Sequence, residues 1–264
     1  MNGTGRRRSL EQHQVDRFDQ TLTQLQSSQG RFDRGLRRLI VLGLRAVGWR
    51  LFVERASHLP ARAGRPGSGC VLVVAPHRAW VEPFLLVAAW PAGAAHLVWL
   101  ADGPTATRSR WRRALLPRLG VIPIAGGVDG PRRLAALAAE ACREGHAVVV
   151  FPEVGSPSAP DRARRLSPGF AYLALRAGAP IVPLVVGGTH HIARDVTFSL
   201  DFGAAIEPGP AMDDPFSGEG RERARARSSR LVALVACVLP RRTGEADAAA
   251  PAEARWRWLG SLVG

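Results

Sequence analysis

A histidine and a glutamate follow a strongly apolar run early in the chain. The sequence reads VLVVA over residues 71–75, then Pro76, and places His77 and Glu82 directly after it. On a continuous helix a five-residue offset separates two side chains by about 140° around the axis, so the pair meets only if His77 lies in a loop and Glu82 opens the next helix. In that geometry the carboxylate orients the imidazole and stabilises its protonated form. The other ring nitrogen can then take a proton from a hydroxyl.

Two residue pairs in the chain have this spacing. His190 and Asp195 also lie five residues apart after an apolar run. We interpret His190 and His191 as residues of a solvated loop or of a pocket rim. Taken alone, His77 and Glu82 also fit an ordinary surface loop, so the choice depends on the surrounding elements.

Short apolar runs alternate with helix-like segments from residue 70 onward. Strands are predicted over 70–75, 96–101, 121–124, 147–151, 181–186 and 196–203, and helices over 129–145, 167–179 and 219–239. This alternation predicts an α/β fold with a mostly parallel or mixed central sheet flanked by helices. We expect the strand of 196–203 to be antiparallel and to lie at the sheet edge.

Composition divides the chain into four parts. These are a flexible or helical extension (1–35), an amphipathic helical segment (36–57), the α/β domain (58–240), and a linker with an Arg/Trp tail (241–264). Arginines interrupt the segment 36–57, whereas a bilayer-spanning helix requires about 20 mostly apolar residues. The segment fits a helix at a membrane interface, with Trp49 at the boundary. A helix packed on its own domain with a basic face exposed fits equally well.

The charge and the cysteines narrow the class of protein. The formal net charge is +14 and every basic residue is arginine, which favours an anionic membrane surface, an acidic carrier protein or nucleic acid as a partner. No nucleic-acid reader motif is present, so we expect no specific nucleic-acid binding. Cys70, Cys142 and Cys237 lack metal-site spacing and predict core thiols in a reducing compartment. The first residues lack the apolar core of a secretory signal.

Four motifs then occur in a fixed order. They are PHRAWVEP (76–83), LGVIPIAGG (119–127), FPEVGSPS (151–158) and GAPIVPLVV (178–186). Their order resembles the glycerolipid acyltransferase family, which includes the lysophosphatidate acyltransferases. The resemblance covers roughly residues 37–205, and four ordered motifs are far more specific than any one of them.

The resemblance implies an enzyme that moves a fatty acyl group from acyl-CoA or acyl carrier protein to a hydroxyl of a lysolipid. It implies His77 as the general base and Glu82 as its orienting partner, with no serine or cysteine nucleophile, no metal and no organic cofactor. Backbone groups near Gly120 and Ile122 would donate to the oxyanion. The other residues expected to contact substrate are Trp80, Pro123, Phe151, Pro152 and Glu153.

Three departures from the family pattern bear on this expectation. Glu82 replaces an aspartate, Pro76 replaces an asparagine, and the third motif continues with residues 154–157 in place of Gly-Thr-Arg-Ser. Both arginines expected to bind the phosphate of the acceptor are missing, and a phosphate monoester requires strong cationic partners. Either another arginine substitutes for them or the acceptor differs from lysophosphatidate, and we favour the second. The candidate substitutes are Arg132, Arg133, Arg164 and Arg165.

The sequence is compatible with two hypotheses of function. The first is an acyltransferase in the cytoplasm, bound peripherally to the inner face of the cell membrane. The second is a catalytically degenerate relative that binds lipid or a partner protein, since fold and function are separable.

Overall fold

The computed structural model describes residues 35–59, 67–90, 95–102, 119–124, 130–154, 165–189, 192–193, 195–213, 215 and 218–239. Outside these residues lie positions 1–34 of the predicted extension (1–35), the predicted linker and tail (241–264), and Arg164, His190 and His191.

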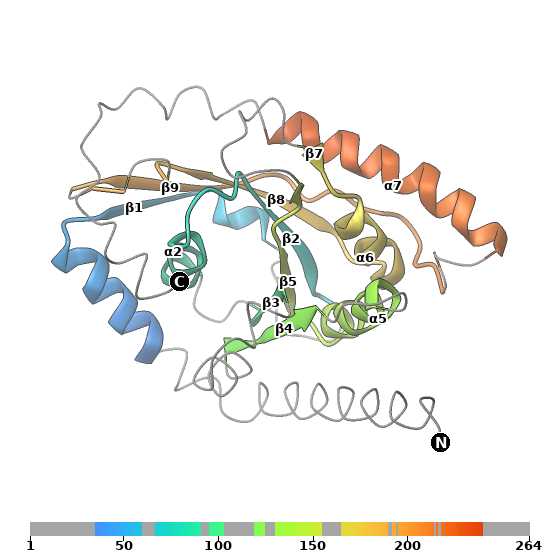
Figure 1. The fold of residues 1–264 in the computed structure, drawn as a ribbon, viewed down its shortest axis with the longest axis horizontal. Helices are drawn as coiled ribbons and strands as arrows, with labels where there is room; N and C mark the ends of the chain where they lie inside the picture. Colours follow the sequence, from blue (N-terminus) through green and yellow to red (C-terminus); the bar gives the residue numbers. More distant parts are fainter. Residues whose placement is uncertain are drawn as a thin grey trace, which may run out of the picture.

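A seven-stranded sheet forms the centre of the fold, in the order β1–β9–β8–β2–β5–β3–β4 (Figure 1). Strands β8, β2, β5, β3 and β4 are parallel to one another, whereas β9 is antiparallel to β8 and β1 is parallel to β9. The α/β class and the mixed sheet are therefore as predicted. The strands are β1 (Arg50–Glu54), β2 (Cys70–Ala75), β3 (Leu97–Asp102), β4 (Val121–Ile124), β5 (Ala147–Val150), β8 (Ile181–Gly187) and β9 (Thr197–Phe202).

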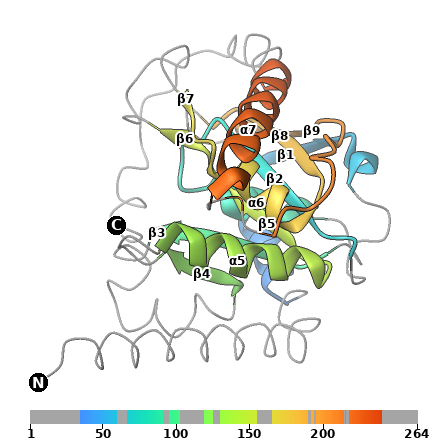
Figure 2. The same cartoon turned by 90° about the vertical axis from the view of Figure 1, so that its right-hand side faces the viewer.

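Helices cover both faces of the sheet. Helices α5 (Gly130–Arg143), α6 (Gly169–Ala177) and α7 (Gly218–Val238) pack on one face, seen toward the viewer in Figure 2. Helix α2 (Glu82–Ala89) and a helix over residues 35–46 lie on the other face. Because both faces are covered, β2 is buried along its whole length, and Val71 and Leu72 enter opposite core layers.

A short antiparallel hairpin follows β5. It consists of β6 (Glu153–Val154) and β7 (Arg165–Leu166), with Glu153 opposite Leu166 and Val154 opposite Arg165. The hairpin continues the chain beyond the carboxyl end of β5, where the third sequence motif begins.

The segment 36–57 is only partly helical, so the prediction of one continuous helix is wrong. The helix ends at residue 46, and Gly48 adopts a φ of 77°. The Trp49 N–H donates to the carbonyl of Leu44 at 2.9 Å, which closes the helix in a Schellman turn. Residues 50–54 then form β1 because β9 offers a partner strand. This pairing also places β9 inside the sheet, so the expected edge position of 196–203 is wrong.

Trp49 is fixed to its own domain. Its indole N–H donates to the carbonyl of Ala193 at 2.6 Å, and its ring meets Phe198 edge-on at 5.1 Å. A tryptophan with a satisfied N–H and a core neighbour contributes to packing. These contacts favour the alternative in which this part of the segment packs on its own domain, and the place of Trp49 at a membrane boundary stays a prediction.

Cys70 and Cys142 are core residues, as predicted, whereas Cys237 is exposed on α7, so its predicted place in the core is wrong. Burial raises the pKa of Cys70 to about 12, and burial together with the neighbouring Cys70 raises the pKa of Cys142 as well. Both thiols stay protonated at neutral pH and are therefore poor nucleophiles.

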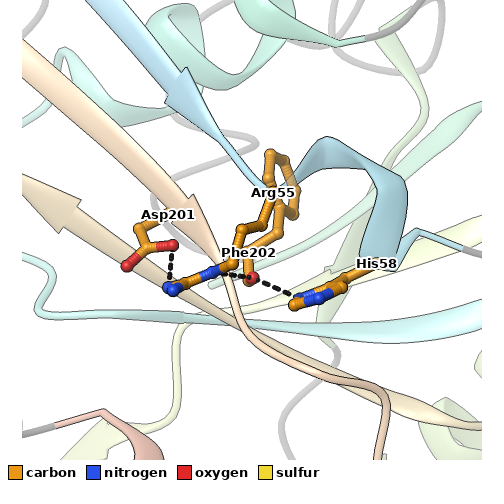
Figure 3. Close-up of polar contacts among 4 residues, drawn as sticks. All are labelled: Arg55, His58, Asp201 and Phe202. Carbon is orange, nitrogen blue, oxygen red and sulfur yellow. Dashed lines mark hydrogen bonds and ion pairs between the residues drawn. The ribbon is translucent and has the colours of Figure 1, made fainter.

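A polar cluster joins the end of β1 to the end of β9 (Figure 3). Arg55, at a φ of 52°, donates from Nη2 to the carboxylate of Asp201 and from Nε to the carbonyl of Phe202 at 3.2 Å. His58, in the 3-10 helix η1 (Ala56–His58), donates from Nδ1 to the same carbonyl at 2.8 Å. Because Asp201 is buried, its charge needs this guanidinium.

Replacing Asp201→Asn should lower the free energy of unfolding by about 2 kcal/mol, because a charged hydrogen bond becomes a neutral one in a buried setting. Urea denaturation measures the change. The matched control is Glu140→Gln, which breaks the exposed Glu140–Arg143 pair and should cost less than about 0.5 kcal/mol. Equal losses in the two variants would contradict the importance of the buried pair.

Candidate active site

The carboxyl ends of β2 and β5 lie side by side, because the two strands are parallel neighbours. His77 follows β2 after a cis Ala75–Pro76 peptide, and Phe151 follows β5 directly. Clefts of α/β proteins form at this edge of the sheet. The two sequence motifs that contain His77 and Phe151 therefore meet at the edge where a site is expected.

Glu82 lies at the start of α2 and turns back toward the strand end. Its Oε2 accepts a hydrogen bond from His77 Nδ1 at 2.5 Å. Its Oε1 accepts two backbone N–H bonds, from Arg78 at 2.8 Å and from Ala79 at 2.9 Å. The loop that carries the histidine is thus closed around one carboxylate.

Burial differs sharply between the two partners. The side chain of Glu82 is 0% exposed, whereas that of His77 is 43% exposed. A buried carboxylate is costly unless hydrogen bonds compensate it, and here three N–H donors do so. The imidazole is held through Nδ1 while its side chain remains 43% exposed, which suits a base that must meet a substrate.

Local sequence explains why α2 starts where it does. Pro83 occupies its first turn, where a missing N–H is tolerated, and Glu82 places negative charge at the helix N-terminus. Leu85 and Leu86 are fully buried and anchor the helix in the core. The packing of these two leucines in the core therefore fixes the position of Glu82.

An aromatic stack lies behind the imidazole. The Phe151 ring centroid is 4.2 Å from that of His77, with an interplanar angle of 36°. Trp99, on β3 and 8% exposed, stacks on Phe151 at 6.4 Å and 17°. The stack connects the core to the exposed histidine.

Beside the histidine lies a second aromatic pair, which is exposed. Trp80 and Phe84 meet edge-on at 5.8 Å and are 37% and 39% exposed. Trp80 was expected to contact substrate, whereas Phe84 and Trp99 were not singled out from the sequence. Both follow apolar patterns that resemble ordinary core positions, so no sequence signal marked them.

Comparison with known proteins decides the family. The family model described as Acyltransferase matches residues 50–187, slightly more than half of the chain. This protein belongs to the acyltransferase family. The family suggested by the four motifs is thereby confirmed.

Among solved structures, the fold resembles the crystal structure of the 1-acyl-sn-glycerophosphate (LPA) acyltransferase PlsC from Thermotoga maritima. The TM-score is 0.55, with 17% sequence identity over 82% of this chain and 81% of that chain. At this identity the likeness concerns the fold. No curated protein matches the chain.

The second acyltransferase motif lies on β4, the end strand of the sheet. Gly120 precedes β4 and its carbonyl accepts the Trp99 N–H at 2.9 Å. The side chain of Ile122 is buried in the core layer next to α5. The contact with substrate predicted for this residue is therefore one through its backbone. Pro123 is level with Ala101 of β3, nearer the carboxyl edge.

The third acyltransferase motif leads into the β6–β7 hairpin. Pro152 is buried, and its carbonyl accepts the Ser167 N–H at 2.7 Å. Glu153 lies in β6, and Arg165 is exposed on β7 opposite Val154. The hairpin therefore holds Arg165 at the end of the motif.

The remaining candidate arginines belong to another element. Arg132 and Arg133 lie in the first turn of α5, which connects the carboxyl end of β4 with β5. No group of three or more His, Cys, Asp or Glu side chains suited to a metal ion occurs among the described residues.

Replacing Glu82→Gln should lower the free energy of unfolding by about 2 kcal/mol. The amide offers one acceptor oxygen where three N–H donors converge, so at least one donor loses its partner. Urea denaturation measures the loss, with Glu222→Gln on the exposed side of α7 as the matched control. Identical stability of both variants and the parent would contradict the proposed closure of the loop.

Proposed function

We propose that this acyltransferase works at a membrane surface and moves a fatty acyl group from acyl-CoA or acyl carrier protein to a hydroxyl of a lipid-like acceptor. The observation that supports it is the hydrogen bond from His77 Nδ1 to the buried Glu82 carboxylate, at the exposed edge of the sheet. Imidazole held in this way by a carboxylate is suited to general-base catalysis.

In the proposed reaction, His77 Nε2 takes the proton of the acceptor hydroxyl while the oxygen of that hydroxyl bonds to the thioester carbonyl carbon. Glu82 faces the resulting imidazolium and stabilises its positive charge. The tetrahedral intermediate collapses, the carbon–sulfur bond breaks, and the imidazolium returns the proton to the leaving thiolate. The products are an ester and a free thiol. Because the acceptor oxygen attacks the thioester directly, this route forms no covalent intermediate on the protein.

Backbone N–H groups are the proposed donors to the oxyanion of the intermediate. The backbone of the second motif is the candidate. Gly120 precedes the amino end of β4, and the strand runs from there to the carboxyl edge beside β3. Such donors stabilise charge that develops only in the transition state.

We propose an acceptor that is not recognised through a phosphate monoester. The motif positions that carry phosphate-binding arginines in the family pattern hold other residues here, and Arg165 is a single exposed guanidinium on β7. A phosphate dianion needs strong cationic or bidentate partners, and the family pattern supplies two arginines for it. A lysolipid or glycolipid hydroxyl without that group fits this composition better.

Replacing His77→Ala should lower acyl transfer by about 10²- to 10⁴-fold, the usual contribution of a general base. Mass spectrometry of products from acyl-CoA or acyl carrier protein with a panel of lysolipids and glycolipids measures turnover. The matched control is His58→Ala, because His58 binds the Phe202 carbonyl and takes no part in the proposed reaction.

Unchanged turnover in His77→Ala would remove this histidine from the mechanism. A parent protein that transfers no acyl group, but gains activity with Glu82→Asp and Ser156→Arg together, would instead indicate a degenerate lipid-binding relative.

Membrane contact is proposed through the helix of residues 35–46. Leu39 and Leu42 are 69% and 61% exposed on it, with Arg38 and Arg45 exposed beside them. Arg37 Nε donates to the Ala88 carbonyl at 3.1 Å, which fixes this helix to the end of α2. Exposed leucines flanked by arginines suit an interface rich in anionic lipid. Within the described part of the chain, no helix is long and apolar enough to span a bilayer.

Replacing Leu39→Glu together with Leu42→Glu should weaken binding to vesicles of phosphatidylglycerol and phosphatidylcholine by at least about tenfold, because two apolar contacts with the membrane are lost. Vesicle sedimentation measures the affinity. Leu234→Glu is the matched control, since Leu234 is exposed on α7 across the sheet. Equal affinity of the double variant and the control would contradict a membrane contact through this helix.

A further inference from the structure

The imidazole of His77 contacts the protein at its edge, through Nδ1, and on its ring face. The hydrogen bond to Glu82 acts at the Nδ1 atom on the edge of the ring, and a small tilt of the ring bends this bond at little cost. The second contact is with the ring of Phe151 at 4.2 Å between centroids. A contact on the ring face opposes the tilt that this hydrogen bond tolerates.

The position of Phe151 is itself fixed by contacts with the protein. Trp99 lies nearly parallel to it, at 17°, and is buried in the same core layer that Phe151 contacts. The backbone following Phe151 is fixed as well, because the Pro152 carbonyl accepts the Ser167 N–H at 2.7 Å. The phenyl ring is therefore a support whose own position is set by the core.

We propose that Phe151 is a positioning residue for the base: the stack of Trp99 and Phe151 sets the plane of the His77 imidazole and so aims Nε2 at the acceptor hydroxyl. This inference rests on the proposed acyl transfer. It differs from the sequence-based expectation that Phe151 contacts substrate. A tilt of 36° still permits broad contact between the two rings, so the phenyl face that meets the imidazole is covered by it.

Positioning and substrate contact affect different kinetic constants. A ring that aims the base acts on the chemical step, so its loss lowers kcat and leaves the Michaelis constants nearly unchanged. A ring that forms a wall for acyl chain or acceptor contributes binding, so its loss raises KM. Misplacement of a catalytic group by about 1 Å costs roughly 100-fold in rate.

The test compares Phe151→Leu, which removes the aromatic face, with Phe151→Tyr, which retains it. We expect Phe151→Leu to lower kcat roughly 10- to 100-fold, with KM for the thioester and the acceptor each within about twofold. Phe151→Tyr should restore most of kcat. The matched control is Phe198→Leu, a fully buried phenylalanine of the same core layer, which should lose stability but keep kcat.

A second measurement does not depend on turnover. Proton NMR resolves the Cε1 proton of His77, assigned by its disappearance in His77→Gln among the seven histidines. The Phe151 ring should shift this signal upfield in the parent and in Phe151→Tyr, and the shift should vanish in Phe151→Leu.

An unchanged kcat in Phe151→Leu, a rise in KM that exceeds the fall in kcat, or an unchanged His77 signal would each overturn the inference. A parent protein inactive with every acceptor would overturn the proposed acyl transfer and not the contact, because the NMR comparison still reports the orientation of the ring.

Discussion

The site depends on the burial of one carboxylate. Glu82 cannot remain charged in the core without donors, and the three N–H groups that supply its hydrogen bonds all belong to the loop 77–79. The requirement to compensate this charge therefore shapes the loop and fixes the histidine. The helix that carries the carboxylate is anchored in the core by Leu85 and Leu86, so the position of Glu82 depends on core packing.

The extra methylene of glutamate has a physical use here. One oxygen reaches the imidazole while the other receives two backbone N–H bonds, so a single side chain spans the turn from strand to helix. A shorter aspartate starting from the same backbone position would not reach both sets of donors without movement of the loop. The departure from the family pattern is accommodated by this local geometry.

Much of the fold was predictable from local pattern. Continuous apolar runs predicted β2, β5 and β8 because a parallel sheet buries both faces of its central strands. The strand β1 was missed because its partner β9 lies far along the chain, as the 146-residue separation of Arg55 and Asp201 illustrates. The contact of His77 with Glu82 was predicted from their spacing together with the strand before them and the helix after them, because the spacing alone also fits a surface loop. The stack of Trp99 on Phe151 could not be predicted, because local sequence determines neither the order of the strands in the sheet nor their register.

The order of the strands also affects how the chain folds during its synthesis. Strand β2 is complete at residue 75, but its neighbour β5 begins only at residue 147 and its other neighbour β8 ends at residue 187. At about 5 to 20 residues per second, the ribosome needs roughly 5 to 20 s to supply them. During that interval a wholly apolar strand with two unpaired edges emerges from the ribosome, which is the kind of segment that chaperones bind and that aggregates when they are scarce.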